Sequence, residues 1–353
     1  MRRINGYITR MIVSAVLIVL LVIVGLDCLT AMVDELANVQ GNYNFVEVLA
    51  YVGLTIPSRI YEFLPFSTLI GCLAGLGILA SNSELVIIRS VGTSTWQIVW
   101  MVMKPALLIM FCGVLLGEYI APHTEQIAQS RRALAESGNG GFTSRSGLWN
   151  REGNYYMHFN AVQPNGVLHG VTLLDFASDR RLKSALYAKR ASYQKGDWLW
   201  EGVVETLISV EKTERLEQNT RYWKTALTPD ILNLVIMSPD NLSMSGLREY
   251  SRYLKSQGLD NGDYELAFWK KSLQPLAIAG LVLIAISFVF GPLREVTMGF
   301  RVFSGVIIGI AFRTSQDLLG PASLVFGFSP LYAVLVPIAI CIVVGLFMLH
   351  RVR

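Results

Sequence analysis

The chain has 353 residues, 52% of them hydrophobic, and a mean hydropathy of +0.45, which excludes an ordinary soluble protein. Its apolar residues come in long runs, so we interpret it as an integral membrane protein. The net charge of +4 is spread along the chain and gives no indication of nucleic-acid binding. The four cysteines lie in apolar runs, where we expect them to behave as small buried apolar residues, and no disulfide framework, metal site or other cofactor is expected.

Three apolar runs near the N-terminus, residues 11–33, 60–80 and 98–120, predict membrane-spanning helices. The first is too long and too charge-flanked for a cleaved signal peptide, so it is expected to stay as a membrane anchor. The second carries Gly71, Gly75 and Gly77, small residues that would let another helix approach closely.

Residues 83–92, between the second and third runs, read Ser-Glu-Leu-Val-Ile-Ile-Arg-Ser-Val-Gly. They predict a short helix with Ser83 as N-cap, Glu84 in the first turn and Gly92 as its stop. The apolar face would hold Leu85, Ile88 and Gly92, with Val86 and Arg89 beside it. We interpret the segment as a coupling helix that meets a partner. The alternative is an amphipathic connector that meets none.

The composition then becomes polar, and no apolar run between residues 122 and 265 could cross a bilayer. Alternating β-formers predict strands over residues 155–162, 167–176, 182–194, 198–211 and 221–227, which at this spacing favour a sandwich or jelly roll. A short amphipathic helix over 246–257 and three further spans, 273–290, 302–319 and 331–349, follow.

The predicted fold is therefore a membrane α-helical protein with six transmembrane helices, three plus three, and an inserted all-β jelly-roll domain. Its divisions are residues 1–135 with the coupling helix 83–92, residues 136–245 for the β domain, and residues 246–353 for the connecting helix and last three spans.

Basic residues predict the orientation. The short loops on one side hold Arg59 alone, whereas the other side holds eight arginines: Arg2, Arg3, Arg10, Arg89, Arg294, Arg301, Arg351 and Arg353. Both termini and the coupling helix are therefore expected in the cytoplasm, and the β domain outside it. The sequence contains no P-loop motif, so a partner must supply ATP hydrolysis if transport needs it.

Three groups of residues resemble the LptF/LptG permease family, and its LptG members more closely. They are Ser83-Glu84-Leu85; Phe290-Gly291-Pro292-Leu293-Arg294 with Met298-Gly299-Phe300-Arg301; and Ser245-Gly246-Leu247 with Tyr253-Leu254-Lys255-Ser256. The resemblance covers essentially the whole chain. It implies a multi-pass subunit, in the inner membrane of a Gram-negative bacterium, of an ABC-type transporter that extracts lipopolysaccharide from that membrane.

The resemblance also implies partners: an LptF-type permease, two copies of an LptB-type ATPase, and an LptC-type single-span protein. Lipopolysaccharide would pass from the surrounding membrane lipids to a bridge of periplasmic jelly rolls. The chain itself is then a permease subunit and not an enzyme.

The family's functional residues transfer to matching positions of this sequence. The resemblance implies ATPase coupling by Ser83, Glu84, Leu85, Ile88 and Arg89, although Glu84 could instead merely cap its own helix. A cavity for the lipid's acyl chains would be lined by Leu26, Thr30, Phe303, Ile307, Ile310 and Arg313.

Arg313 is a candidate because the sequence departs from the family elsewhere. Some relatives have lysines that meet lipid phosphates at the outer end of the first span, where this chain has Ala31, Ala37 and Asn38. Arg313 could supply the missing positive charge as a bidentate donor. Alternatively, Arg313 and Asp317, four residues apart, neutralise each other. Asp27, in the first span, could have a structural or a partner-facing role.

One other function class remains open from the residues alone. The chain could be a membrane-anchored scaffold whose β domain binds a periplasmic partner without transport. An intramembrane lipid-modifying enzyme has no support, because the sequence offers no nucleophile elbow and no paired-carboxylate site.

Overall fold

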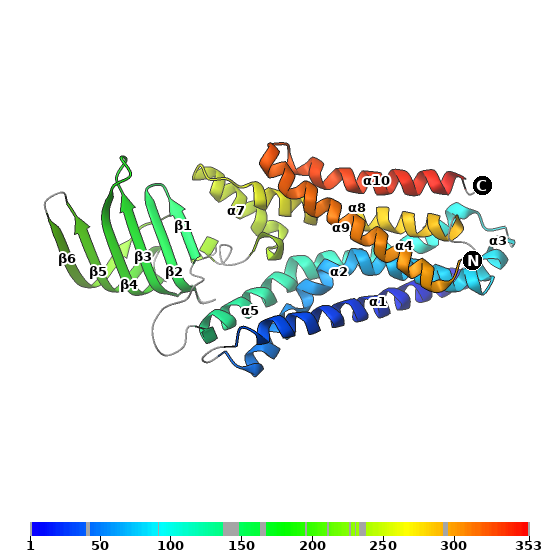
Figure 1. The fold of residues 1–353 in the computed structure, drawn as a ribbon, viewed down its shortest axis with the longest axis horizontal. Coiled ribbons are helices and arrows are strands. Elements are labelled where there is room, and N and C mark those ends of the chain that lie inside the picture. The colour runs from blue at the N-terminus through cyan, green and yellow to red at the C-terminus, as the bar shows by residue number, and fades with distance from the viewer. Residues whose placement is uncertain are drawn as a thin grey trace. The chain divides into compact units, whose positions relative to one another are not determined.

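A computed structural model describes residues 2–39, 43–90, 92–136, 148–162, 167–194, 196–209, 212–225, 227–229, 231–232, 238–291 and 296–351. The predicted break at 138–141 and the motif residues 292–294 lie outside these ranges. Figure 1 shows the elements in chain order, with helices at both ends of the sequence and strands between them. Six of the described helices are long and apolar enough to cross a membrane.

Three of these candidate spans precede the strands. The first two are α1 (Arg2–Leu36) and α2 (Phe45–Ser81). The third is one continuous helix made of α4 (Thr95–Leu115), a π-helical turn (Leu116–Ile120) and α5 (Ala121–Glu136). The short helix α3 (Glu84–Ser90) lies between α2 and α4. The other three spans follow the strands and are α8 (Gly262–Phe290), α9 (Met298–Phe326) and α10 (Pro330–Arg351).

The chain forms two compact units, each built from separate segments. The first consists of Met1–Thr30, Ile56–Ala121 and Gly262–Arg353, and the second of Ala31–Thr55 and Pro122–Asn261. In the first unit, α8 packs against α10 and α4, and α10 also packs against α9. The core of this unit is aliphatic, with α8 and α2 supplying many of its fully buried side chains.

The glycines of α2 bring helices into close contact, as the sequence predicts. A Cβ added to Gly71 would lie 2.6 Å from the Cα of Val16 on α1, and one added to Gly75 would lie 3.1 Å from the Ile12 side chain. Gly77 faces α9 instead, where its carbonyl accepts a 2.6 Å hydrogen bond from Nη1 of Arg301. Small residues therefore position α2 between two neighbouring helices.

Local signals explain where several helices begin and end. Ser94 caps α4 through a capping box with Gln97, which satisfies two backbone N–H groups reciprocally. Ser243 caps α7 (Met244–Ser256), the amphipathic helix expected over 246–257. Gly327 ends α9 in the left-handed conformation, with φ of 72°.

The second unit contains one antiparallel sheet in which each strand pairs with the next along the chain. Its strands are β1 (Leu148–Glu152), β2 (Tyr155–Val162), β3 (Leu168–Phe176), β4 (Leu182–Gln194), β5 (Asp197–Ile208) and β6 (Thr213–Trp223). Met157, Phe159 and Val171 are buried beside one another on β2 and β3. The described strands form a meander, so the jelly-roll prediction goes beyond them.

Two strand predictions differ from the structure. No strand was predicted over Leu148–Glu152, but this segment forms β1, because it pairs along its whole length with β2. The last predicted strand, residues 221–227, is wrong in its bounds: β6 covers Thr213–Trp223, and its pairing with β5 starts at Thr213 opposite Ile208. The alternation in β6 is weak because most of its side chains are exposed.

Candidate functional site: an apolar cavity and an ion-pair belt

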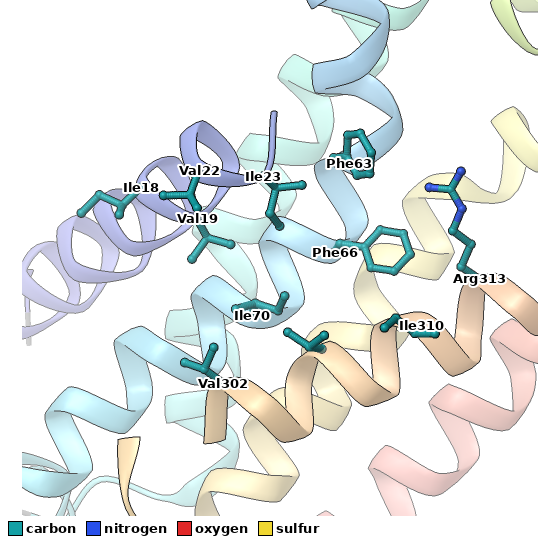
Figure 2. A pocket seen from close by; sticks show the side chains of 11 residues that line it. Ile18, Val19, Val22, Ile23, Phe63, Phe66, Ile70, Val302, Ile310 and Arg313 are labelled. Carbon is teal, nitrogen blue, oxygen red and sulfur yellow. The ribbon is translucent and has the colours of Figure 1, made fainter. Parts of the chain in front are cut away.

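A cavity of about 520 Å³ lies between α1, α2 and α9, within the first compact unit (Figure 2). Eleven residues line it, of which ten are apolar and one is an arginine: Ile18, Val19, Val22, Ile23, Phe63, Phe66, Ile70, Val302, Val306, Ile310 and Arg313. A volume in the range of about 300–1,000 Å³ is typical of ligand pockets. The lining is suited to hydrocarbon rather than to a polar solute.

The lining follows from helical periodicity. On α9 the residues Val302, Val306, Ile310 and Arg313 are separated by four, four and three positions, and therefore form one stripe. The residues contributed by α2 are three and four positions apart, again on one face. α1 and α9 are the least buried of the six candidate spans, so the walls of this cavity continue into faces that the chain itself leaves exposed.

Arg313 lies at one end of the cavity and is held by two carboxylates. Its Nη2 is 2.5 Å from Oε1 of Glu62 on α2, and its Nε is 3.5 Å from Oδ2 of Asp317, one turn along α9. Its guanidinium also lies 5.8 Å and 6.0 Å from the ring centroids of Phe63 and Phe66. The expected pairing with Asp317 is present, and Glu62 adds a shorter contact that no sequence spacing could indicate.

The contacts of Arg313 belong to a longer series of ion pairs, which we call the ion-pair belt. Arg59 on α2 pairs with Asp27 on α1, and Lys270 on α8 lies 4.0 Å from Asp317. Arg59 and Glu62 are three residues apart on α2, so the two groups of ion pairs lie on neighbouring positions of that helix and together involve four helices. The members of the belt, in order across α1, α2, α9 and α8, are Asp27, Arg59, Glu62, Arg313, Asp317 and Lys270. Three acids and three bases make the belt neutral as a whole.

The position of Arg59 corrects one part of the sequence interpretation. Arg59 was expected in a short loop between the first two spans, but it lies inside α2, which begins at Phe45. The apolar run from residue 60 underestimates this helix, because its N-terminal half is less apolar although equally helical. The expectation that all four cysteines are buried holds for Cys72 and Cys341 only, because Cys28 is partly buried and Cys112 is exposed.

Two of the six predicted cavity residues, Ile310 and Arg313, line the cavity. Leu26 and Thr30 continue the α1 stripe of Val22 at intervals of four, and both are exposed. Phe303 and Ile307 are also exposed, on the same helix as Ile310. The sequence interpretation missed the contribution of α2, for which the spacing of Phe63, Phe66 and Ile70 was the available signal.

The helix α3 occupies most of the predicted coupling segment, and its two faces differ. Leu85 and Ile88 are 5% and 8% exposed and belong to the core of the first unit. Val86 and Ile87 are 54% and 60% exposed, and Arg89 is exposed beside them. The structure thus places Leu85 and Ile88 against this chain's own helices and leaves the opposite face of α3 exposed.

Glu84 and Ser83 form the junction between α2 and α3. The carboxylate of Glu84 lies near the side chain of Tyr7, close to the start of α1. Ser83 accepts the first helical hydrogen bonds through its carbonyl, from Val86 and Ile87, but its φ of 60° is left-handed rather than the extended conformation of an ordinary N-cap. Gly92 has φ of 89°, which fits the predicted stop; Val91 lies outside the described residues.

Comparison with known proteins gives a consistent result across the whole length. The model of the family described as "Lipopolysaccharide export system permease LptF/LptG" matches residues 6–351. The chain is 36% identical over 351 residues to the lipopolysaccharide export system permease protein LptG of Escherichia coli strain K12, covering 98% of each chain. It is 34% identical over 352 residues to LptG of Haemophilus influenzae, covering 99% of this chain and 98% of the relative. The chain therefore belongs to the lipopolysaccharide export system permease LptF/LptG family.

Proposed function

We propose that this chain is the transmembrane subunit of an ABC-type transporter that extracts lipopolysaccharide from the inner membrane and passes it toward the outer membrane. The observation that carries the proposal is the apolar cavity between α1, α2 and α9, with a single cationic side chain at its end. The curated relatives named as lipopolysaccharide export permeases support the same substrate.

The cavity addresses the main physical obstacle to extraction. Moving an acyl chain from a bilayer into water costs roughly 0.8 kcal/mol per CH₂ group, so a lipid with several chains cannot leave unaided. A pocket lined by valine, isoleucine and phenylalanine offers those chains an environment similar to the bilayer interior. Transfer into such a pocket leaves the chains out of water throughout.

Arg313 could meet a phosphate of the lipid, but only at the expense of an existing contact. Its guanidinium already faces the carboxylates of Glu62 and Asp317. An incoming phosphate would have to replace one of them, and the displaced carboxylate would need another partner. We propose this exchange as the role of Arg313 in substrate binding, with Leu26, Thr30, Phe303 and Ile307 extending the apolar wall beyond the cavity.

We propose that α3 is the coupling helix through which a separate ATPase acts. Val86, Ile87 and Arg89 form an exposed apolar and basic surface that a partner groove could accept. Leu85 and Ile88 fix α3 to the helical unit, so a push on α3 would reach α1 and α2 as a rigid-body movement. Glu84 would join this surface if its carboxylate turned from Tyr7 toward a partner's arginine.

The remaining assembly is proposed from family membership. The partners are an LptF-type permease forming a heterodimer, two copies of an LptB-type ATPase and an LptC-type single-span protein. Both termini and α3 would face the cytoplasm, in a three-plus-three arrangement of spans. The sheet would belong to a periplasmic jelly roll that receives the lipid.

Photo-crosslinking tests the proposal directly. A photoreactive residue at Val306, in the cavity wall, should capture lipopolysaccharide when the full-length chain is reconstituted in nanodiscs with its co-purifying subunits. The matched control is Val343 on α10, another exposed valine of a membrane span that does not line the cavity. Several-fold stronger capture at Val306 supports a transporter, whereas equal capture at both positions would favour the scaffold alternative.

A further inference from the structure

A second cavity, of about 480 Å³, lies in the sheet unit, away from the membrane helices in sequence. Two turns form its rim. The β1–β2 turn contributes Gly153 and Asn154, and the β3–β4 turn contributes Ser178 and Arg180. The backbone N–H of Phe176 donates a 3.2 Å hydrogen bond to the carbonyl of Asn154, so the two turns are fixed to each other. The shape of the cavity is therefore set by hydrogen-bonded backbone at one end of the sheet.

The floor of this cavity is aromatic. Strand register places Arg151, Tyr156 and Leu174 opposite one another on β1, β2 and β3, and their side chains consequently share one face. The rings of Tyr156 and Phe176 meet edge to face at 5.3 Å. Trp149, two residues before Arg151 on the same face, is 60% exposed. This surface differs from the cavity between α1, α2 and α9, whose apolar residues are mostly valine and isoleucine.

The charge of the lining is positive. Arg151 and Arg180 contribute two guanidinium groups, and the lining residues include neither aspartate nor glutamate. The acids that neighbour them in sequence have other partners: Glu152 accepts a hydrogen bond from Thr225, and Asp179 pairs with Arg181 at 3.4 Å. Such a pocket attracts an anion.

Arg151 is oriented by its surroundings. Its Nε donates a 3.1 Å hydrogen bond to the carbonyl of Gly153, and its guanidinium carbon lies 5.3 Å from the centre of the Tyr156 ring. The Nε–H group and the face of the guanidinium that lies on Tyr156 are therefore already occupied. The terminal nitrogens carry the remaining donors, in the fork geometry that suits a phosphate or carboxylate.

Arg180 has a backbone conformation that disfavours its residue type. Its φ is 66°, in the left-handed region where glycine or asparagine is less strained. The turn itself requires this conformation, because the N–H of Arg180 bonds the carbonyl of Ala177 and the N–H of Ala177 bonds that of Arg181. Arginine at this position therefore costs some backbone energy, and such strained residues are often found at ligand-binding sites.

We infer that this cavity binds an anionic saccharide, with a phosphate or carboxylate group between Arg151 and Arg180 and a sugar ring against Trp149 and Tyr156. The apolar C–H faces of a pyranose ring pack well on exposed aromatic rings, and its charged substituents require the arginines. In lipopolysaccharide the sugars and the acyl chains would then be held at separate places. The inference rests on the proposed function insofar as lipopolysaccharide is the source of the saccharide.

The test places a photoreactive residue at Ser178, on the rim of the cavity, in the full-length chain in nanodiscs with its co-purifying subunits. Three probes are used: a lipopolysaccharide that carries phosphorylated core sugars, lipid A that carries no core sugar, and the delipidated core oligosaccharide. Capture of the lipopolysaccharide is expected, with much weaker capture of lipid A. An excess of free oligosaccharide should compete.

Matched variants identify the arginines that matter. Arg151→Gln removes the charge but keeps a hydrogen-bonding side chain, and Arg180→Asn removes the charge while tolerating the left-handed backbone. Each should reduce capture at Ser178 by about tenfold, as expected for the loss of a charge-assisted hydrogen bond. Lys183→Gln is the control, because Lys183 is a nearby exposed cation that does not line the cavity.

The possible results separate this inference from the proposed function. Equal capture in all three variants, equal capture of lipid A, or no competition by a large excess of oligosaccharide would each overturn the saccharide site. If capture at Val306 persists in that case, the transport proposal stands alone. Failure of capture at both Val306 and Ser178 would instead contradict the proposed function, and with it the source of the saccharide.

Discussion

Nη2 of Arg313 on α9 lies 2.5 Å from Oε1 of Glu62 on α2, although 251 residues separate them in sequence. The pair closes one end of the apolar cavity and connects the two halves of the ion-pair belt. The pair therefore joins a helix that precedes the sheet to one that follows it, as the hydrogen bond from Arg301 to Gly77 also does. Both side chains are about half exposed, so the energy of the pair is modest.

A double-mutant cycle should detect this pair. We expect Arg313→Gln and Glu62→Gln to have non-additive effects on the free energy of unfolding, with a coupling energy of about 0.5–1 kcal/mol. Unfolding in bicelles provides the measurement. Strictly additive effects would show that the contact contributes nothing to the fold.

The close approach of α1 and α2 predicts a sharp difference between two glycines of α2. Gly71→Ala should destabilise the chain by about 1–3 kcal/mol, because the new methyl group would overlap the backbone of Val16 and cannot be accommodated by a rotamer change. Gly53→Ala should be neutral or stabilising by about 0.5 kcal/mol, since no atom lies within 4 Å of its added Cβ. Thermal unfolding of the two variants side by side distinguishes them. Similar losses of stability would contradict the observed packing of α1 on α2.

Two adjacent isoleucines of α3 provide a matched test of the coupling helix. Ile88→Ala should lower the free energy of unfolding by about 2 kcal/mol or more, because Ile88 is buried in the core. Ile87→Ala should leave stability within about 0.5 kcal/mol, because its side chain is exposed.

The same two variants separate folding from partner binding. We expect Ile87→Ala to weaken co-purification of the proposed ATPase. Ile88→Ala should leave co-purification unchanged once the yield is corrected for the amount of folded protein. Pull-down from solubilised membranes measures this effect. Undiminished recovery of the ATPase with Ile87→Ala and with Arg89→Ala would remove α3 from the proposed interface.

His169 on β3 predicts how the sheet responds to pH. Burial, assisted by the positive charge of Arg190 opposite it on β4, lowers the pKa of His169 below its ordinary value. The unfolded chain then binds more protons than the folded one, so stability is complete above the ordinary pKa of about 6.5 and is lost as the pH falls below it.

Hydrogen exchange can test this pH dependence in the intact chain. After correction for intrinsic rates, amides of β2, β3 and β4 should exchange faster near pH 5.5 than near pH 7.5. His169→Gln cannot titrate and should reduce that difference. A pH response that is the same in the variant would assign the effect to other groups.

Periodicity and composition predicted most of the fold. The apolar runs located all six candidate spans, and four of the five predicted strands overlap β2 to β5 closely. The errors occur where the pattern is weak. Phe45 to Arg59 is helical but only moderately apolar, and β6 carries mostly exposed residues, so neither has the period that marks a half-buried element.

The site could be predicted less completely, because it depends on contacts between distant segments. The spacing of Arg313 and Asp317 made their pairing foreseeable, whereas the partnership with Glu62 depends on how α2 and α9 pack. In α3, periodicity identified Leu85 and Ile88 as one face, but it could not decide whether a partner or the chain's own core covers that face. Packing between helices settled the question.

The most direct test of the central claim is the effect of ATP on crosslinking at Val306. With lipopolysaccharide loaded into nanodiscs that contain the complete exporter, capture at Val306 should fall when ATP is hydrolysed and should persist with a non-hydrolysable analogue. That result is predicted if the cavity between α1, α2 and α9 is emptied by the transport cycle. Capture that stays constant through many rounds of ATP hydrolysis would contradict the account.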